Sequence, residues 1–211
     1  MELVQFCSRQ GIFFIRLIGD LEFNSSSRLE TLLSWIKENR SIKRLVIDLS
    51  YAQTIDSTNL GMIARLGLYA HQKHEHMPIL SPGAAAQVKQ TLSKFQLHQL
   101  FRWKGEDESF GIEDGAFIRL LGPVEEAEVS ICERAIEAHR ALVSLGEGNP
   151  SEFNSVIAGL QIERALIASE EDEVQDESDE SWSGNDCPEL KDLEVNRPCI
   201  LPYTRTQRDF H

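Results

Sequence analysis

The stretch LVIDLSYAQTIDSTNLGMIARL, residues 45–66, carries the strongest structural signal in the chain. Its beginning is a short aliphatic and β-branched run, which together with Arg44 is typical of a strand buried on both faces. From Asp56 onward, capping residues lead into an amphipathic helix that is expected to end near Lys73. The segment therefore predicts a central strand over 44–49, a loop over 51–56 and a helix that begins with a hydroxyl side chain.

The flanking sequence predicts further short strands and helices in alternation. Gly11 separates two hydrophobic segments, as in a hairpin with a tight turn. The other expected elements are hairpin strands over 2–8 and 12–18, helices over 25–39 and 84–95, a short strand over 77–80, a helical turn over 97–101 and an edge strand over 102–104. This order predicts a small α/β domain over 1–105, whose sheet is mixed because of the opening hairpin.

The second half of the chain has a different organisation. Residues 106–123 receive no assignment from their pattern, whereas 124–168 predict two amphipathic helices joined by a Gly/Pro loop, an antiparallel hairpin. The apolar faces of this hairpin need a cover, which the first domain, a second copy of the chain or a partner could supply. Residues 169–211 have the acidic, serine-rich composition of a disordered tail.

The charge of the chain is concentrated in that tail. The formal net charge is −13, and residues 170–194 alone contain 12 acidic side chains and one lysine. The remainder is nearly neutral and offers no cationic field for phosphates, so direct nucleic-acid binding is not expected. No apolar run is long enough to span a membrane and no leader sequence is evident, which predicts a cytoplasmic protein.

Motifs for catalysis or metal binding are not found in the sequence. Phosphate-binding glycine loops, a nucleophile elbow and zinc-protease signatures are missing, so neither an enzyme nor a cofactor is expected. His71, His74 and His76 are interpreted as a solvated helix end rather than a metal site, because no further ligands lie at suitable spacing. The four cysteines form no C-x-x-C pair and are expected to be reduced.

The segment from Asp56 to Gly61, DSTNLG, resembles the signature of the STAS domain, a family that includes anti-sigma factor antagonists and parts of sulphate transporters. Ile18-Gly19-Asp20-Leu21 also resembles the family's entry to its first helix, as does the final turn from Leu97 to Phe101. The resemblance covers about 1–105 and implies a STAS-like fold, here followed by a helical hairpin.

The resemblance implies regulation by partner switching. In such antagonists the serine that corresponds to Ser57 is phosphorylated by an anti-sigma factor with serine kinase activity, and a serine phosphatase resets it. Ser57 is then the phosphorylation site, with Thr58 as the alternative acceptor. The unphosphorylated form binds the anti-sigma factor and so frees the sigma factor. STAS domains also serve as accessory modules of lipid and anion transporters, where the same helix binds without phosphorylation, and this is the second hypothesis.

The residues around Ser57 allow two interpretations each. Ser57 alone could be an ordinary helix N-cap, and Asp56 could cap or brace the loop instead of contacting a partner. One side of the helix forms an apolar strip, Met62–Leu66–Tyr69, which predicts a protein interface unless the last helices or the hairpin cover it. The expected partner-binding residues are Asp20, Asp56, Thr58, Asn59, Met62, Arg65, Leu66 and Tyr69. For the hairpin we expect homodimerisation or docking.

Overall fold

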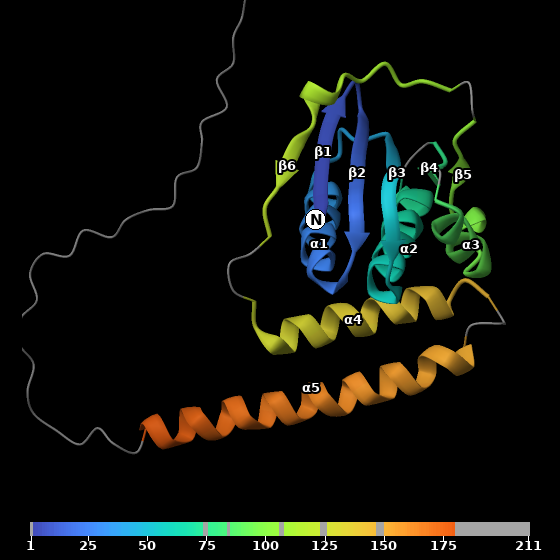
Figure 1. The fold of residues 1–211 in the computed structure, drawn as a ribbon. Coiled ribbons are helices and arrows are strands. Elements are labelled where there is room, and N and C mark those ends of the chain that lie inside the picture. Colours follow the sequence, from blue (N-terminus) through green and yellow to red (C-terminus); the bar gives the residue numbers. More distant parts are fainter. Residues whose placement is uncertain are drawn as a thin grey trace, which may run out of the picture. The chain divides into compact units, whose positions relative to one another are not determined.

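A six-stranded mixed sheet forms the centre of the computed structural model, which describes residues 2–73, 76–83, 85–105, 108–122, 126–146 and 150–179 (Figure 1). The strand order is β5-β4-β3-β2-β1-β6, with β1 antiparallel to β2 and β6 and the other neighbours parallel. The strands are β1 (Leu3–Arg9), β2 (Ile12–Leu21), β3 (Arg44–Ile55), β4 (Ile79–Ser81), β5 (Arg102–Trp103) and β6 (Ile118–Leu120). The predicted α/β class and mixed sheet are thus confirmed.

The opening hairpin turns through two residues, Gln10 and Gly11, both in the left-handed region with φ of 52° and 79°. Two successive residues with positive φ are typical of the tight turn that suits the twist of paired strands. Arg9 then lies opposite Ile12, and the register continues to Leu3 opposite Ile18. The turn at Gly11 is the one that the sequence predicts.

Three helices lie on one face of the sheet: α1 (Ser26–Glu38), α2 (Ser57–Lys73) and α3 (Ala86–Lys94) (Figure 1). Alternate side chains of β2, namely Phe13, Ile15 and Leu17, face them and are fully buried. The predicted helices 25–39 and 84–95 and the predicted helix to Lys73 are confirmed within one or two residues at each end.

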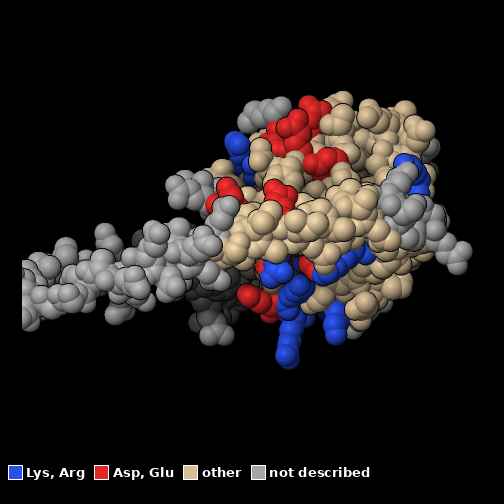
Figure 2. Space-filling view, turned by 90° about the horizontal axis from the view of Figure 1, so that it is seen from below, with Lys and Arg blue, Asp and Glu red and all other residues tan. Residues whose placement is uncertain are grey.

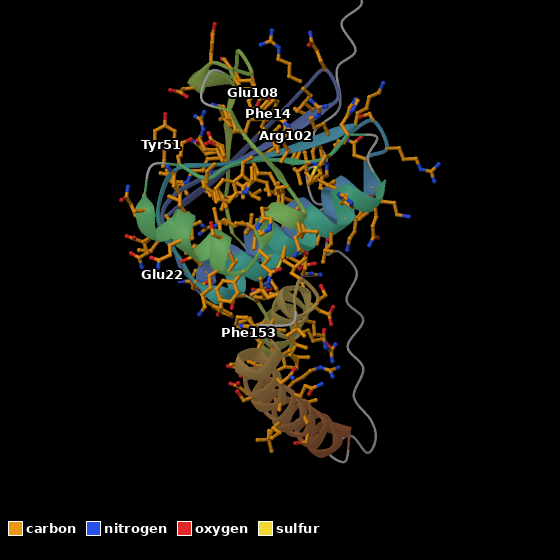
Figure 3. All side chains as sticks on the ribbon, turned by 90° about the vertical axis from the view of Figure 1, so that its right-hand side faces the viewer. Phe14, Glu22, Tyr51, Arg102, Glu108 and Phe153 are labelled. Carbon is orange, nitrogen blue, oxygen red and sulfur yellow. The ribbon has the colours of Figure 1, made fainter. Side chains whose placement is uncertain are left out.

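A second, smaller cluster lies on the opposite face of the sheet. Phe14 and Val46 contribute to it from the central strands, and Phe110 and Phe117 cover it from the segment after β5. Figure 3 shows Phe14 on the side of the sheet away from α2. A cavity of about 290 Å³ lies here, and Arg16 and Asp48, which form an ion pair of 3.0 Å, are among its lining residues.

Two sequence-based boundaries in the sheet need correction. The expected loop over 51–56 is wrong, because β3 continues to Ile55 and pairs with β2 as far as Leu21. The polar residues of this part of β3 concealed the strand: Tyr51 and Gln53 are exposed and Thr54 is partly buried. In the unassigned segment 106–123, β6 pairs with β1 and extends the sheet.

The C-terminal helices α4 (Glu128–Val143) and α5 (Pro150–Asp179) run antiparallel, as the predicted hairpin requires (Figure 1). In the structure α5 continues past residue 168, the expected end of the hairpin, to Asp179, and Gly159 lies within the helix without ending it. The rest of the expected tail, 180–211, lies outside the described residues. The domain division by residue number stays a prediction.

The structure identifies what covers α4. This helix packs along α2, and Ala138, Ala141 and Leu142 join the main hydrophobic core. Of the three covers considered from the sequence, the first domain is the one observed for α4. The helix α5 adds Phe153 to the same core, whereas Val156, Ile162 and Leu166 are exposed.

Candidate functional site at the start of α2

Asp56 is the residue that caps α2. Its side-chain oxygen Oδ1 accepts a hydrogen bond of 2.7 Å from the backbone N–H of Asn59, three residues along the chain. Its backbone N–H donates to the Leu21 carbonyl at 3.1 Å, which holds the cap against the end of β2. Asp56 thus provides a hydrogen-bond acceptor for a backbone N–H that has no partner within the helix. Ser57 is therefore not needed as the cap.

Ser57 is the first residue of α2 and is exposed. Its hydroxyl oxygen lies 3.1 Å from Nε2 of His139, which comes from α4, 82 residues later. Nδ1 of His139 lies 2.7 Å from the Ala135 carbonyl, which can only accept a hydrogen bond. In the neutral imidazole Nδ1 therefore carries the proton, and Nε2 accepts the hydrogen bond from the Ser57 hydroxyl.

His139 itself is held in a closed environment. Its residue is only 4% exposed, and its ring centroid lies 5.2 Å from that of Phe153 at the start of α5. Phe153 in turn contacts Phe95, with ring centroids 5.5 Å apart. Figure 3 shows Phe153 at the beginning of α5, on the side that faces the sheet and its helices. The packing of α4 and α5 therefore holds the His139 ring in the position from which it contacts Ser57.

Asn59 forms the buried polar centre of this region. Its side-chain nitrogen donates to the Glu22 carbonyl at 2.7 Å and to the Asp56 carboxylate at 3.0 Å. Its side-chain oxygen accepts from the Ser25 hydroxyl at 2.9 Å. Asn59 is fully buried, so these bonds replace the water that its amide loses. The network holds the starts of α1 and α2 in fixed positions relative to each other.

Gly61 permits a close approach of α4. A Cβ atom on Gly61 would lie 2.3 Å from the backbone oxygen of Ala138, a distance at which one of the two helices would have to move. The glycine of the signature thus has a steric role in this chain, because it lets the backbones of α2 and α4 touch.

The expected partner-binding residues do not form one exposed surface. Met62 and Leu66 are fully buried, Thr58 is 7% exposed, and Asn59 is occupied in its network. The prediction of an exposed Met62–Leu66–Tyr69 strip is wrong, and the alternative is correct: α2 packs against the sheet, α1 and α4, which leaves no apolar strip open. Tyr69 is partly buried.

The charged members of the expected set, Asp20, Asp56 and Arg65, remain at least partly accessible. Asp20 is exposed and accepts a hydrogen bond of 3.0 Å from the Thr54 hydroxyl. Arg65 forms an ion pair with Glu30 of α1. Together with Ser57 and Asp56, Asp20 and Arg65 are the predicted site residues that retain exposed surface, besides part of Tyr69.

His139 is the residue that sequence reasoning missed. It follows Cys132 and Ile136 at helical spacing, on a helix whose other apolar positions are buried. A histidine in such a face is a weak signal, because it is more often a core residue. The histidines considered from the sequence lie elsewhere, and His74 lies outside the described residues. Within the described part of the chain, no group of three or more His, Cys, Asp or Glu side chains is suited to hold a metal ion.

The charged groups near the hairpin largely pair with one another. Arg134 forms an ion pair with Glu126, and Arg164 forms one with Glu133 at 2.8 Å. Figure 2 shows the molecule from below, where several of the described Lys and Arg side chains lie close together along one edge and Asp and Glu side chains lie at several separate places. None of the helices in the described residues is both long and apolar enough to cross a bilayer.

Comparison with known proteins identifies the first part of the chain. Residues 5–108 match the family model of the STAS domain. A search of curated proteins found no match to the chain. The matched region contains most of β1, the strands β2 to β5 and the helices α1 to α3, and therefore Ser57 at the start of α2. It contains neither α4 nor α5.

Proposed function

The chain belongs to the STAS domain family through residues 5–108, and from this membership we propose that it is an anti-sigma factor antagonist switched by phosphorylation of Ser57. STAS domains generally bind partners rather than catalyse reactions, and a general role in STAS-type regulation or transport follows from the family. The assignment as an anti-sigma factor antagonist depends on Ser57.

The observation that carries the proposal is that Asp56, and not Ser57, caps the start of α2. Asp56 caps α2, so the Ser57 hydroxyl is free of that structural duty and lies on an exposed residue at the helix start. A phosphoryl group there adds about −1.5 to −2 charges beside free N–H groups and the positive end of the helix dipole, which tolerate it. The fold can therefore persist while a docking surface is altered.

The proposed partners are an anti-sigma factor with serine kinase activity and a serine phosphatase. The unphosphorylated chain binds the anti-sigma factor, and the phosphate prevents that binding through the cost of desolvating it in an interface. Asp56 and Asp20 carry charge of the same sign as the phosphate. Where the phosphate lies near them, their repulsion adds to the cost of binding.

Mass spectrometry of the chain isolated from its native cells tests this proposal. We expect a phosphopeptide that contains Ser57 and a co-purifying serine kinase of the histidine-kinase-like ATPase fold. With that kinase purified, Ser57→Asp should lose binding and Ser57→Ala should keep it. Ser109→Asp, an exposed change on the other face of the sheet, is the matched control.

A chain without phosphate on Ser57 supports the second candidate function, that of an accessory module of a transporter. If Ser57 is unmodified and the chain co-purifies with a membrane transporter, it is an accessory STAS module. Equal kinase binding by Ser57→Asp, Ser57→Ala and the parent chain would contradict the switch.

A further inference from the structure

The cavity of about 290 Å³ lies on the face of the sheet away from α2, and the proposed switch makes no use of it. Residues of β2, β3 and β4 form its floor, and the segment after β5 lies over them. Figure 3 shows Phe14, from the floor, and Glu108, from that segment, on the same side of the sheet. The cavity is therefore separate from Ser57 and from the helical hairpin.

The floor of the cavity changes from apolar to polar along the strands. Phe14 of β2 and Val46 of β3 lie opposite each other, and the next pair on the same face is Arg16 and Asp48. Phe110 packs on the Phe14 ring from above, with ring centroids 5.4 Å apart and an angle of 65° between the planes. One half of the cavity is therefore apolar and aromatic, and the other half is polar.

In the polar half, hydrogen-bond donors remain free while the acceptors are occupied. Oδ2 of Asp48 accepts from Nε of Arg16 at 3.0 Å, and Oδ1 accepts from the backbone N–H of Ser50 at 2.9 Å. Nη1 of Arg16 donates to Asp114, whereas Nη2 forms no hydrogen bond within the described residues. The Oγ atoms of Ser50 and Ser81 lie 3.1 Å apart, so the hydroxyl that accepts keeps its own proton for another acceptor.

Lys104 adds a positive charge to the lining of the cavity and is partly buried. Its backbone N–H donates to the Leu80 carbonyl, but its ammonium forms no ion pair or hydrogen bond in the part of the chain that the structure describes. The carboxylate of Glu108 in the same lining accepts from both terminal nitrogens of Arg102, at 2.8 and 2.6 Å. The polar half therefore suits a ligand group that accepts hydrogen bonds and carries negative charge.

The volume and the walls of the cavity limit the rest of the ligand. Sites for small molecules have volumes of about 300–1,000 Å³, so this cavity lies at the lower end and suits a single ring rather than a nucleotide. Aromatic rings favour offset or edge-to-face contacts with one another. The apolar half offers such contacts through Phe14 and Phe110.

We propose that this cavity binds a small carboxylate that carries one aromatic ring. The ring lies against Phe14 and Phe110, and the carboxylate accepts hydrogen bonds from Lys104, Nη2 of Arg16 and one of the serine hydroxyls. The ligand contacts both the sheet and the segment after β5, so its binding stabilises the folded protein by mass action. This site goes beyond the proposed function and does not rest on the role of Ser57.

Nuclear magnetic resonance of the isotope-labelled full chain tests the site, with benzoate and phenylacetate as probes. Each carboxylate should shift the backbone amide signals of Ser81 and Gly111 in a saturable way, with a Kd of about 1 mM or lower. Benzamide has the same ring without the charge, and benzylamine has the opposite charge. Both should bind more weakly than the carboxylates by a factor of about ten or more.

A change in each half of the cavity locates the ligand. Lys104→Met keeps an apolar side chain of similar length but removes the charge, so it should weaken phenylacetate binding about fivefold or more and leave benzamide binding unchanged. Lys89→Met, an exposed change on α3, is the matched control and should bind phenylacetate as the parent does. Val46→Phe places a ring in the apolar half and should abolish the binding of both carboxylates. The dispersion of its amide signals shows whether this variant is folded.

Three results would overturn the inference. The first is the lack of saturable shifts at cavity residues with either carboxylate up to about 10 mM. The second is binding of benzylamine as tight as that of phenylacetate, or an equal loss in Lys104→Met and Lys89→Met. The third is unchanged phenylacetate binding by folded Val46→Phe, since the ligand would then lie elsewhere. The modification of Ser57 enters none of these measurements, so this inference and the proposed function fail separately.

Discussion

The hydroxyl of Ser25 donates a hydrogen bond to the side-chain oxygen of Asn59 at 2.9 Å, and this bond joins the start of α1 to the start of α2. Both residues are fully buried. The amide nitrogen of Asn59 is also engaged, by the Glu22 carbonyl and the Asp56 carboxylate. The polar network that positions the proposed switch is therefore satisfied without contact to solvent at Asn59.

Replacing Asn59 with alanine should destabilise the protein by about 2 kcal/mol, because it removes three hydrogen bonds of a fully buried amide, to Ser25, the Glu22 carbonyl and Asp56. Urea unfolding followed by circular dichroism measures this change as a lower midpoint. Asn154→Ala, on the exposed part of α5, is the control and should change the stability by no more than about 0.5 kcal/mol. Equal midpoints for the two variants would contradict the network.

Arg134→Met should weaken the attachment of α4 to α1. The methionine keeps much of the aliphatic volume but loses the bond to Ser26 and leaves Glu126 without its cation. The Arg134 side chain is 5% exposed, so we expect a loss of about 2 kcal/mol. Arg164→Met removes an ion pair whose two side chains are about half exposed and should cost at most about 1 kcal/mol. Thermal unfolding of the two variants in parallel provides the comparison.

Gly67→Ala tests the packing of α2 on the core. A Cβ atom here would lie 2.5 Å from the ring of Phe101, which is 1% exposed. The overlap should outweigh the better helix propensity of alanine and cost about 1–2 kcal/mol. In Gly159→Ala the same propensity acts without a clash and should add about 0.5–1 kcal/mol. A gain in stability for Gly67→Ala would show that the ring can yield.

Arg102 lowers the pKa of Glu108 from 4.5 to about 2 through a side-chain hydrogen bond, with a smaller contribution from the Gly105 backbone. A lowered carboxylate pKa means that the contact is complete above pH 4.5 and is lost as the pH falls toward 2. The contact should therefore persist at pH 3.5. A carboxylate titration by NMR should give the low value for Glu108 in the parent chain and about the ordinary value in Arg102→Gln. An ordinary value in the parent would contradict the contact.

Local signals made much of the STAS domain predictable. The hydrophobic run before Ser50, the turn at Gly11 and the capping residues at Asp56 each act over a few residues, and the strands and helices they predict are present. The strand β3 was underestimated because its last residues are polar and their pairing partner, the end of β2, lies far away in sequence. The hydrophobic pattern of one segment does not show which distant strand it pairs with.

The position of Ser57 was within reach of sequence reasoning, because a hydroxyl that follows a capping aspartate at a helix start is a local arrangement. The contact with His139 was not, since it joins residues 82 positions apart and depends on how α4 packs. The same packing buries Met62 and Leu66, which helical periodicity alone placed on an open face. Periodicity tells which residues share a face of a helix, but long-range packing of other helices determines whether that face meets solvent.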